Sequence, residues 1–338
     1  MTDLGFPPFG LHPLHGVHEP TTDNPSRRPR SVRRTTSIDM TRDEGSLDPV
    51  YLNGRARDLW TAADGAVTEL CSATLSATIE LIARVIRHVE VTPPVAAMSR
   101  LAGAPAMSGF RAAADKVAPE LRRDRDLRYT LLDDVPVATL ISGHALSASN
   151  LLGDVAKSGY YLPVADQCAG FATGGLLLTS FEAGDPVIVT GPEAPDLDHG
   201  EDPQAWHQVA LLPRHAMRRR RRIDVYQGES PSRVGIDAMF RDTYVRSDGV
   251  ETIIHEYTLA AEVDADSGVI AESVATPRVL PWQECPGAVV SAQRIAGMTL
   301  SDLHFRVRHE LFGTSTCTHL NDLLRSVADV EALIDLVR

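Results

Sequence analysis

The sequence predicts an α+β protein made of two similar units, each an antiparallel sheet with helices packed on one face. Two observations support this prediction. Similar blocks of residues occur twice in the same order, and each half of the chain shows strand patterns followed by helix patterns. Blocks that recur in the same order are typical of a duplicated supersecondary unit. Residues that differ between the two copies are therefore candidates for function.

Three pairs of blocks define the duplication. The matching blocks are residues 33–39 with 218–224, residues 54–65 with 238–249, and residues 100–111 with 294–306. The first pair reads RRTTSID in one copy and RRRRRID in the other. In the second pair, Asp58 precedes an Asp-Gly turn by six positions, and Asp242 does the same. Asp-Gly is a common turn between antiparallel strands, so both copies are expected to contain a hairpin here.

The blocks divide the chain into four segments. Residues 1–30 are rich in proline, histidine and glycine without periodicity, which predicts a disordered arm. Residues 31–146 form the first α+β repeat, and residues 215–338 form the second. Residues 147–214 match neither repeat and are expected to form a connecting insertion, partly ordered.

Within the repeats, hydrophobic periodicity and turn residues indicate the elements. Strands are expected at residues 31–40, 50–62 and 67–77, and at residues 221–226, 236–245, 252–264 and 269–275. Helices are expected at residues 95–102, 110–121 and 127–146, and at residues 286–296, 300–311 and 318–337. Pro136 is expected to kink or break the third of these helices, because proline removes a backbone donor.

Composition limits the classes of partner. The formal net charge of −12 argues against general nucleic-acid binding, which requires a positive surface. No apolar run approaches the roughly 20 residues that span a bilayer, so no membrane partner is expected. The amino terminus lacks the features of a signal peptide, and four cysteines do not form a disulfide framework. We therefore expect a cytoplasmic protein. Its arginines are expected to pair with its own carboxylates or to bind a small anionic molecule. The oligomeric state is not indicated.

Asp133 and Asp134 are candidates for acid–base chemistry. They are adjacent carboxylates on an expected apolar helix, where burial and like charge raise the pKa of one of them. The alternative is that one aspartate caps a backbone break near Pro136 while the other pairs with an arginine.

Arg57 and Arg241 occupy matching Arg-Asp dipeptides on expected strands. Neighbouring strand residues point to opposite faces, so each arginine faces away from its aspartate. The duplication favours structural ion pairs. The alternative is that the two arginines line a shared groove and bind a carboxylate or phosphate.

Cys285, Cys317 and His319 occur in the second repeat without counterparts in the first. Cys285 precedes one expected helix, and Cys317 and His319 lie at the start of the last. Thiolate and imidazole groups at helix N-termini are favourable ligands for zinc or iron. The alternative is two buried structural thiols and a histidine that caps a helix.

Part of the second repeat resembles iron–sulfur cluster scaffold proteins of the NifU/IscU type. The similarity spans about residues 257–330 and includes an acidic turn, a Cys-x-x-Ala motif at Cys285 and a helix start at Cys317. It implies the fold of that family and an iron–sulfur site. In that family the ligand histidine directly precedes the last cysteine, whereas His319 follows Cys317 by two positions.

The chain also resembles an uncharacterised bacterial family, a domain of unknown function. The residues that carry this resemblance are the paired arginine-rich strands, LDDVP at residues 132–136 and GTSTCTHL at residues 313–320. The resemblance implies no particular chemistry.

The leading functional hypothesis is a small-molecule enzyme of the lyase or isomerase type. Asp133 or Asp134 would act as the acid–base group, and Arg57 and Arg241 would bind an anionic substrate. This hypothesis rests on the observation that the two copies of the duplicated unit carry different reactive residues.

Two other classes remain open. One is a non-enzymatic metal or iron–sulfur handling protein that uses Cys285, Cys317 and His319, with zinc or iron as the metal. The other is a scaffold protein whose residues 1–30 and 190–205 bind a partner.

Overall fold

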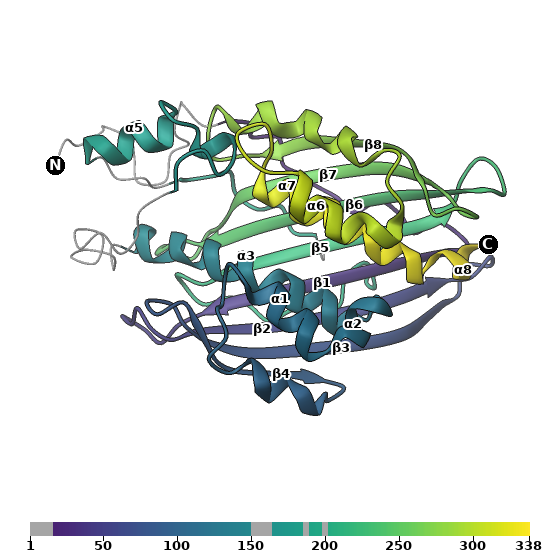
Figure 1. The fold of residues 1–338 in the computed structure, drawn as a ribbon, viewed down its shortest axis with the longest axis horizontal. Helices are drawn as coiled ribbons and strands as arrows, with labels where there is room; N and C mark the ends of the chain where they lie inside the picture. Colours follow the sequence, from purple (N-terminus) through teal and green to yellow (C-terminus); the bar gives the residue numbers. More distant parts are fainter. Residues whose placement is uncertain (1–15, 150–163, 185–188, 198–201) are drawn as a thin grey trace.

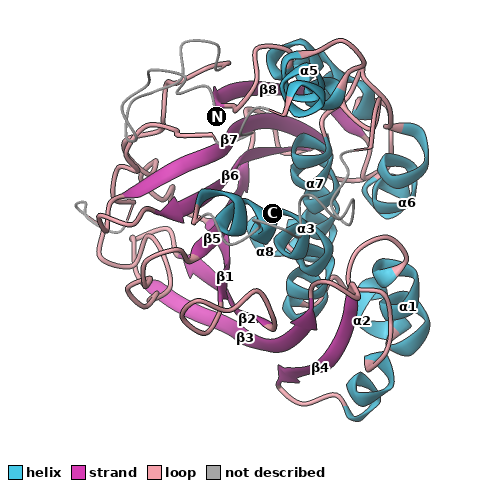
Figure 2. Cartoon of the chain, turned by 90° about the vertical axis from the view of Figure 1, so that its left-hand side faces the viewer, coloured by secondary structure: helices cyan, strands magenta, loops and turns pink. Residues whose placement is uncertain are grey.

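The computed structural model describes residues 16–149, 164–184, 189–197 and 202–338. The described strands form one antiparallel sheet, and the main helices pack against one of its faces (Figure 1). Figure 2 shows that the sheet curves around these helices, while loops and extended segments lie on its other side. The predicted α+β class is confirmed.

Each unit contributes four consecutive strands. The first unit contains β1 (Ser31–Thr41), β2 (Val50–Thr61), β3 (Val67–Glu80) and β4 (Val85–Thr92). The second contains β5 (Met217–Gln227), β6 (Arg233–Val245), β7 (Glu251–Asp264) and β8 (Ile270–Val279). The strand order is β4-β3-β2-β1-β5-β6-β7-β8, so the two units share one sheet instead of forming two. They join because β1 pairs with β5.

The β1–β5 seam has approximate two-fold symmetry. Arg33 of β1 donates to both oxygens of Asp224 at 2.6 and 2.8 Å. Arg218 of β5 donates in the same way to Asp39 of β1, at 2.5 and 2.9 Å. The matching RRTTSID and RRRRRID blocks therefore exchange their ion pairs across the seam.

Local backbone features also repeat. The sheet register shifts after Asp58 in β2 and after Asp242 in β6. The following turns contain Gly65 and Gly249, at φ values of +86° and +91°, in the left-handed region that favours glycine. These matching bulges and turns support the predicted duplication.

Helices follow the strands in each unit. The first unit contains η1 (Ala96–Leu101), a 3-10 helix, then α1 (Phe110–Val117), α2 (Pro119–Arg123) and α3 (Leu127–Ala148). The second contains η3 (Cys285–Ile295), α6 (Leu300–Glu310), α7 (Thr318–Ser326), η4 (Val327–Ala332) and α8 (Ile334–Val337). Between the units lie η2 (Ala169–Phe171) and α5 (Leu176–Ala183). Among the described residues, none of the helices combines the length and hydropathy of a membrane span.

Several elements differ from the prediction. Strand β4 was not predicted, although the duplication requires it as the counterpart of β8. The first helix of each unit is a 3-10 helix, and the expected helix at residues 318–337 is divided among α7, η4 and α8. Helix α3 continues through Pro136, whose surroundings are fully buried, so packing maintains the helix despite the missing donor.

The described part of the expected disordered arm is instead an extended segment held against the sheet. Glu19 donates its backbone N–H to Arg278 at 2.7 Å, and Thr21 donates to Glu256 at 2.6 Å. Arg27 pairs with Asp202 at 2.6 Å. These hydrogen bonds compensate for the low hydrophobicity on which the prediction of disorder rested. Residues 1–15 lie outside the described part.

Apolar residues form a separate core in each unit, beneath its own helices. The first core includes Leu131, Val135 and Ala138 of α3, which packs on β1, β2 and β3. The second includes Leu320, Leu323 and Leu324 of α7. Charged side chains occupy the space between the two cores.

We expect His207 to make stability fall in mild acid. Its ring contacts the hydroxyls of Thr35 and Ser37 at 2.9 and 2.8 Å, and burial, together with nearby arginines such as Arg57, lowers its pKa to about 3. In the unfolded chain the ring titrates near pH 6.5, so acidification protonates the unfolded state first. This stability is complete above about pH 6.5 and is lost as the pH falls towards 3.

The test is urea unfolding of the wild type and His207→Gln between about pH 6.5 and pH 5. The wild type should lose about 2 kcal/mol more than the variant over that range. Glutamine retains hydrogen-bonding capacity toward the two hydroxyls. Parallel pH profiles for the two proteins would show that His207 is not the group responsible.

Candidate functional site

A connected network of ion pairs lies between the sheet and the helices. Its members are Arg111, Arg219, Arg221 and Arg325 with Asp133, Asp134, Asp242 and Asp322. Four guanidinium groups and four carboxylates cancel in formal charge. Charges in such a location require partners, because removal from water is costly. The network therefore constrains how α3 and α7 sit on β5 and β6.

Asp133 is saturated with donors. Arg325 donates to it at 3.0 and 2.7 Å and Arg111 at 2.8 Å, and His304 Nε2 lies 3.1 Å away. Burial would raise the pKa of Asp133, but these three cationic or hydrogen-bonding groups hold it well below the usual range. The arrangement shows a buried carboxylate that fixes α3 against α6 and α7; its acid–base role stays a prediction.

Asp134 has a different environment. It lies 2.5 Å from Arg221 and 3.6 Å from Arg219, and its side chain is 1% exposed. Burial raises its pKa in spite of the two arginines, and the neighbouring carboxylates of Asp322 and Asp133 act in the same direction. The acid–base role of Asp134 stays a prediction.

Arg57 and Arg241 lie on the opposite face of the sheet from the helices. Arg57 donates to the carbonyl of Gln204 at 2.7 Å, and Arg241 donates to Glu256 at 2.5 Å. Arg241 also donates to backbone carbonyls at 2.7 and 2.5 Å. The structure therefore does not bring these arginines together with Asp133.

Two of the cysteines lie in the apolar core of the second unit, and a third lies beside them. Cys285 and Cys317 are buried and free, and Cys168 from the insertion joins them. A Cβ at Gly170 would come within 2.8 Å of the Cys285 sulfur, so the backbone of η2 covers that thiol closely. Burial raises the pKa of Cys317 to about 12. The environment favours neutral thiols.

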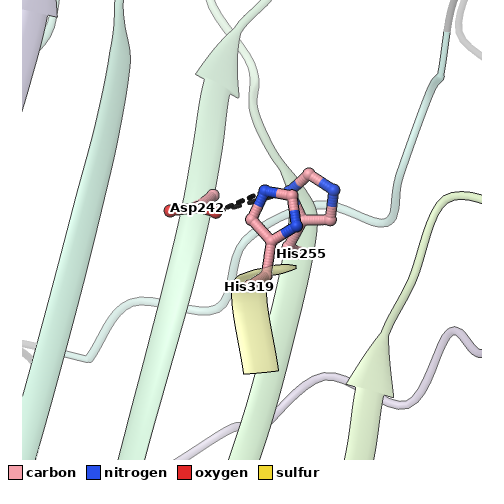
Figure 3. A group of neighbouring side chains, drawn as sticks. All are labelled: Asp242, His255 and His319. Atoms are coloured by element: carbon pink, nitrogen blue, oxygen red, sulfur yellow. Dashed lines mark ion pairs between the residues drawn. The ribbon is translucent and has the colours of Figure 1, made fainter. Parts of the chain in front are cut away.

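His319 instead joins Asp242 and His255, and Figure 3 shows the three side chains together. Asp242 comes from β6, His255 from β7 and His319 from the start of α7. Asp242 Oδ2 lies 3.3 Å from His255 Nδ1 and 4.0 Å from His319 Nε2. The imidazole rings stack with centroids 3.7 Å apart. One donor atom from each residue falls within 4.8 Å of the others, which is a separation that one metal ion can bridge.

The donor atoms of this triad are buried without hydrogen bonds. Neither oxygen of Asp242, nor His255 Nδ1, nor His319 Nε2 has a hydrogen-bond partner among the described residues. Asp242 is 0% exposed, and the histidine side chains are 12% and 13% exposed. Burial and the nearby His255 and Arg219 lower the pKa of His319 well below its usual value, so its ring is neutral. Neutral imidazoles and a carboxylate are ligands for divalent transition metals.

The corresponding position in the first unit is a satisfied ion pair. Asp58 lies opposite Cys71 in the β2–β3 register, as Asp242 lies opposite His255 in the β6–β7 register. Arg34 donates to both oxygens of Asp58, each at 2.8 Å. One copy thus contains a closed Arg–Asp pair where the other contains an aspartate with two histidines.

The sequence identified part of this site. His319 was a predicted metal ligand, but Asp242 was assigned to a structural ion pair, and His255 was not identified. A strand-by-strand comparison of the copies contains the missing signal, because the same spacing that separates Asp58 from Cys71 separates Asp242 from His255. The fragments TLLDD at residues 130–134 and THLND at residues 318–322 give a second signal, because the second residue is leucine in the first copy and His319 in the second.

Comparison with protein families gives a match over part of the chain. Residues 217–333 match a family described as "Protein of unknown function (DUF2889)". The match begins at β5 and ends just beyond η4, so it includes the three residues of the triad. No curated protein and no solved structure matches the chain. The expected similarity to a family of unknown function is supported for the second unit, and the one to iron–sulfur scaffolds stays a resemblance.

We expect the buried thiols to be unreactive in the native protein. A disulfide reagent such as DTNB at about pH 8 should modify no more than one thiol quickly, because Cys71 alone among the four is exposed. Unfolding in guanidinium chloride should release all four. Cys71→Ser should remove any fast native phase, and rapid native modification of two or more thiols would contradict the burial of Cys168, Cys285 and Cys317.

Proposed function

We propose that the protein is a metalloprotein whose second unit binds one divalent transition metal through Asp242, His255 and His319. One observation supports the proposal above the others: the donor atoms of three metal-ligating side chains converge in a buried place without hydrogen bonds. Buried polar atoms almost always have hydrogen-bond partners, so a group of this composition without them points to a ligand. The matching aspartate of the first unit, Asp58, is hydrogen-bonded to Arg34 and so provides a comparison within the same chain.

The ligand set favours catalysis over a purely structural site. Three protein ligands leave coordination positions for water or substrate, whereas structural zinc sites have four protein ligands. Two histidines and one carboxylate suit zinc or iron. Such an ion polarises an oxygen atom of a substrate or activates bound water. Metal-assisted chemistry on a small anionic molecule, of lyase or isomerase type, is therefore the proposed activity.

Asp134 is the proposed acid–base group. Asp134 lies 3.6 Å from Arg219, and Arg219 lies 3.5 Å from Asp242. Asp134 is therefore near the triad without being part of it. Burial raises the pKa of its carboxyl group, which brings that group closer to the range useful for proton exchange. Asp133, held ionised by its donors, would position helix α3.

A second candidate is metal or iron–sulfur handling by Cys285, Cys317 and His319. The observation that favours it is the gathering of three buried thiols near the start of α7. His319 belongs to both ligand sets, so the two candidates are separated by the residues that they do not share.

Elemental analysis separates them. The protein is purified without oxygen and reconstituted separately with Zn²⁺, Fe²⁺ and Co²⁺, then freed of excess metal. We expect about one ion per chain, and metal affinity at least about tenfold weaker in Asp242→Asn and His255→Gln, because each loses a ligand. His304→Gln removes a buried histidine outside the triad and should bind metal normally.

The same measurement on Cys285→Ser and Cys317→Ser tests the second candidate. Normal metal content in both serine variants, with loss in Asp242→Asn, supports the triad. Loss in the serine variants with retention in Asp242→Asn would replace the triad by the thiols. Absence of metal from every preparation would contradict both.

A further inference from the structure

Arg219 is an arginine without hydrogen bonds in the interior of the protein. Its side chain is 1% exposed, and none of its three side-chain nitrogens has a hydrogen-bond partner among the described residues. The nearest carboxylates are Asp242 at 3.5 Å, Asp322 at 3.5 Å and Asp134 at 3.6 Å. Three aspartates therefore surround its charge, while its N–H groups make no hydrogen bond with the described residues.

The matching arginine of the first unit is saturated. Arg34 makes two hydrogen bonds to Asp58 and further ones to the carbonyl of Arg125 at 3.0 Å and to Thr130 at 3.4 Å. Arg34 faces Asp58 across the β1–β2 pair as Arg219 faces Asp242 across β5–β6. Of the two arginines, the one without hydrogen bonds is therefore the one beside the triad, since Arg219 lies 3.5 Å from Asp242. Its guanidinium group also lies 4.8 Å from the ring centroid of Phe240.

Charge balance calls for an anion when metal binds. The connected network contains four arginines and four aspartates, whose formal charges cancel. A divalent cation adds two positive charges to this buried region. Uncompensated buried charge is strongly unfavourable, and a bound ion is the largest local charge in its site. A small anion at the metal offsets part of that excess.

We propose that Arg219 and the metal together bind the carboxylate of a small molecule, which is the anionic group of the substrate. A guanidinium group offers parallel N–H donors that match two carboxylate oxygens, and the metal has coordination positions free for one of them. Burial of Arg219 and Asp242 limits the ligand to a small one. The inference rests on the proposed metal site and names the substrate class for it.

The experiment uses the Co²⁺-loaded full-length protein, whose visible spectrum reports the coordination of the metal. Acetate and formate are the probes, with inorganic phosphate as the competing oxyanion and chloride as the ionic-strength control. We expect acetate and formate to change the spectrum saturably. Arg219→Gln should retain Co²⁺ and bind these anions at least tenfold more weakly. Arg219→Lys, which keeps the charge and loses the paired donors, should also bind them more weakly.

Arg220→Gln is the matched control. Arg220 is the next residue on β5, so its side chain lies on the opposite face of the sheet, near Trp206. This variant loses the same charge and should retain the wild-type response to acetate. Circular dichroism in the near ultraviolet establishes that each variant is folded.

The outcomes separate the two proposals. Failure of the wild type to bind Co²⁺ overturns the metal site itself. Binding of Co²⁺ without a spectral response to acetate or formate overturns the carboxylate inference alone, as does an equal response in Arg219→Gln. A response to phosphate without one to the carboxylates would assign the site to phosphate ligands instead.

Discussion

The structure depends on the pairing of buried charge. Arginines of β1 and β5 lie in the middle of the sheet, where hydrophobic residues normally allow helices to pack. A guanidinium group in such a place is tolerated only next to carboxylates, and aspartates of β2, β6, α3, α7 and η4 supply them. Because a pair is satisfied only in one geometry, these contacts fix strand register and helix position together. The apolar cores then fill the space on either side.

Within this frame the two copies have diverged at corresponding positions. Asp58 and Asp242 occupy corresponding bulges. Asp58 is hydrogen-bonded to its arginine, whereas Asp242 has its arginine 3.5 Å away and lies near two histidines. Duplication permits such divergence, since one copy can maintain the sheet while the other changes. The similarity to a family of unknown function covers the second unit, which is the copy that contains the triad.

The sequence predicted the strand-first units and most element positions because period-two patterns, Asp-Gly turns and capping residues are local signals. It missed β4, in which charged and polar residues of an edge strand weaken the alternation. The triad depends on a tertiary relation between β6, β7 and α7 that no local pattern records. His319 was recognised by residue type alone, whereas His255 is identified only through its register with Asp242. Arg57 and Arg241 were grouped with Asp133 and Asp134 in one predicted site. Strand alternation, however, places the two arginines on the face of the sheet away from the helices.

The exchange of ion pairs at the β1–β5 seam has a consequence for assembly. Arg33 pairs with an aspartate on β5 and Arg218 pairs with one on β1, so these two ion pairs link the units across the seam. An isolated unit would expose an unpaired edge strand with an arginine at one end and an aspartate at the other. Such an edge is self-complementary in antiparallel orientation, the condition for an isologous dimer. The present chain therefore has the internal symmetry of a homodimer whose subunits are covalently joined.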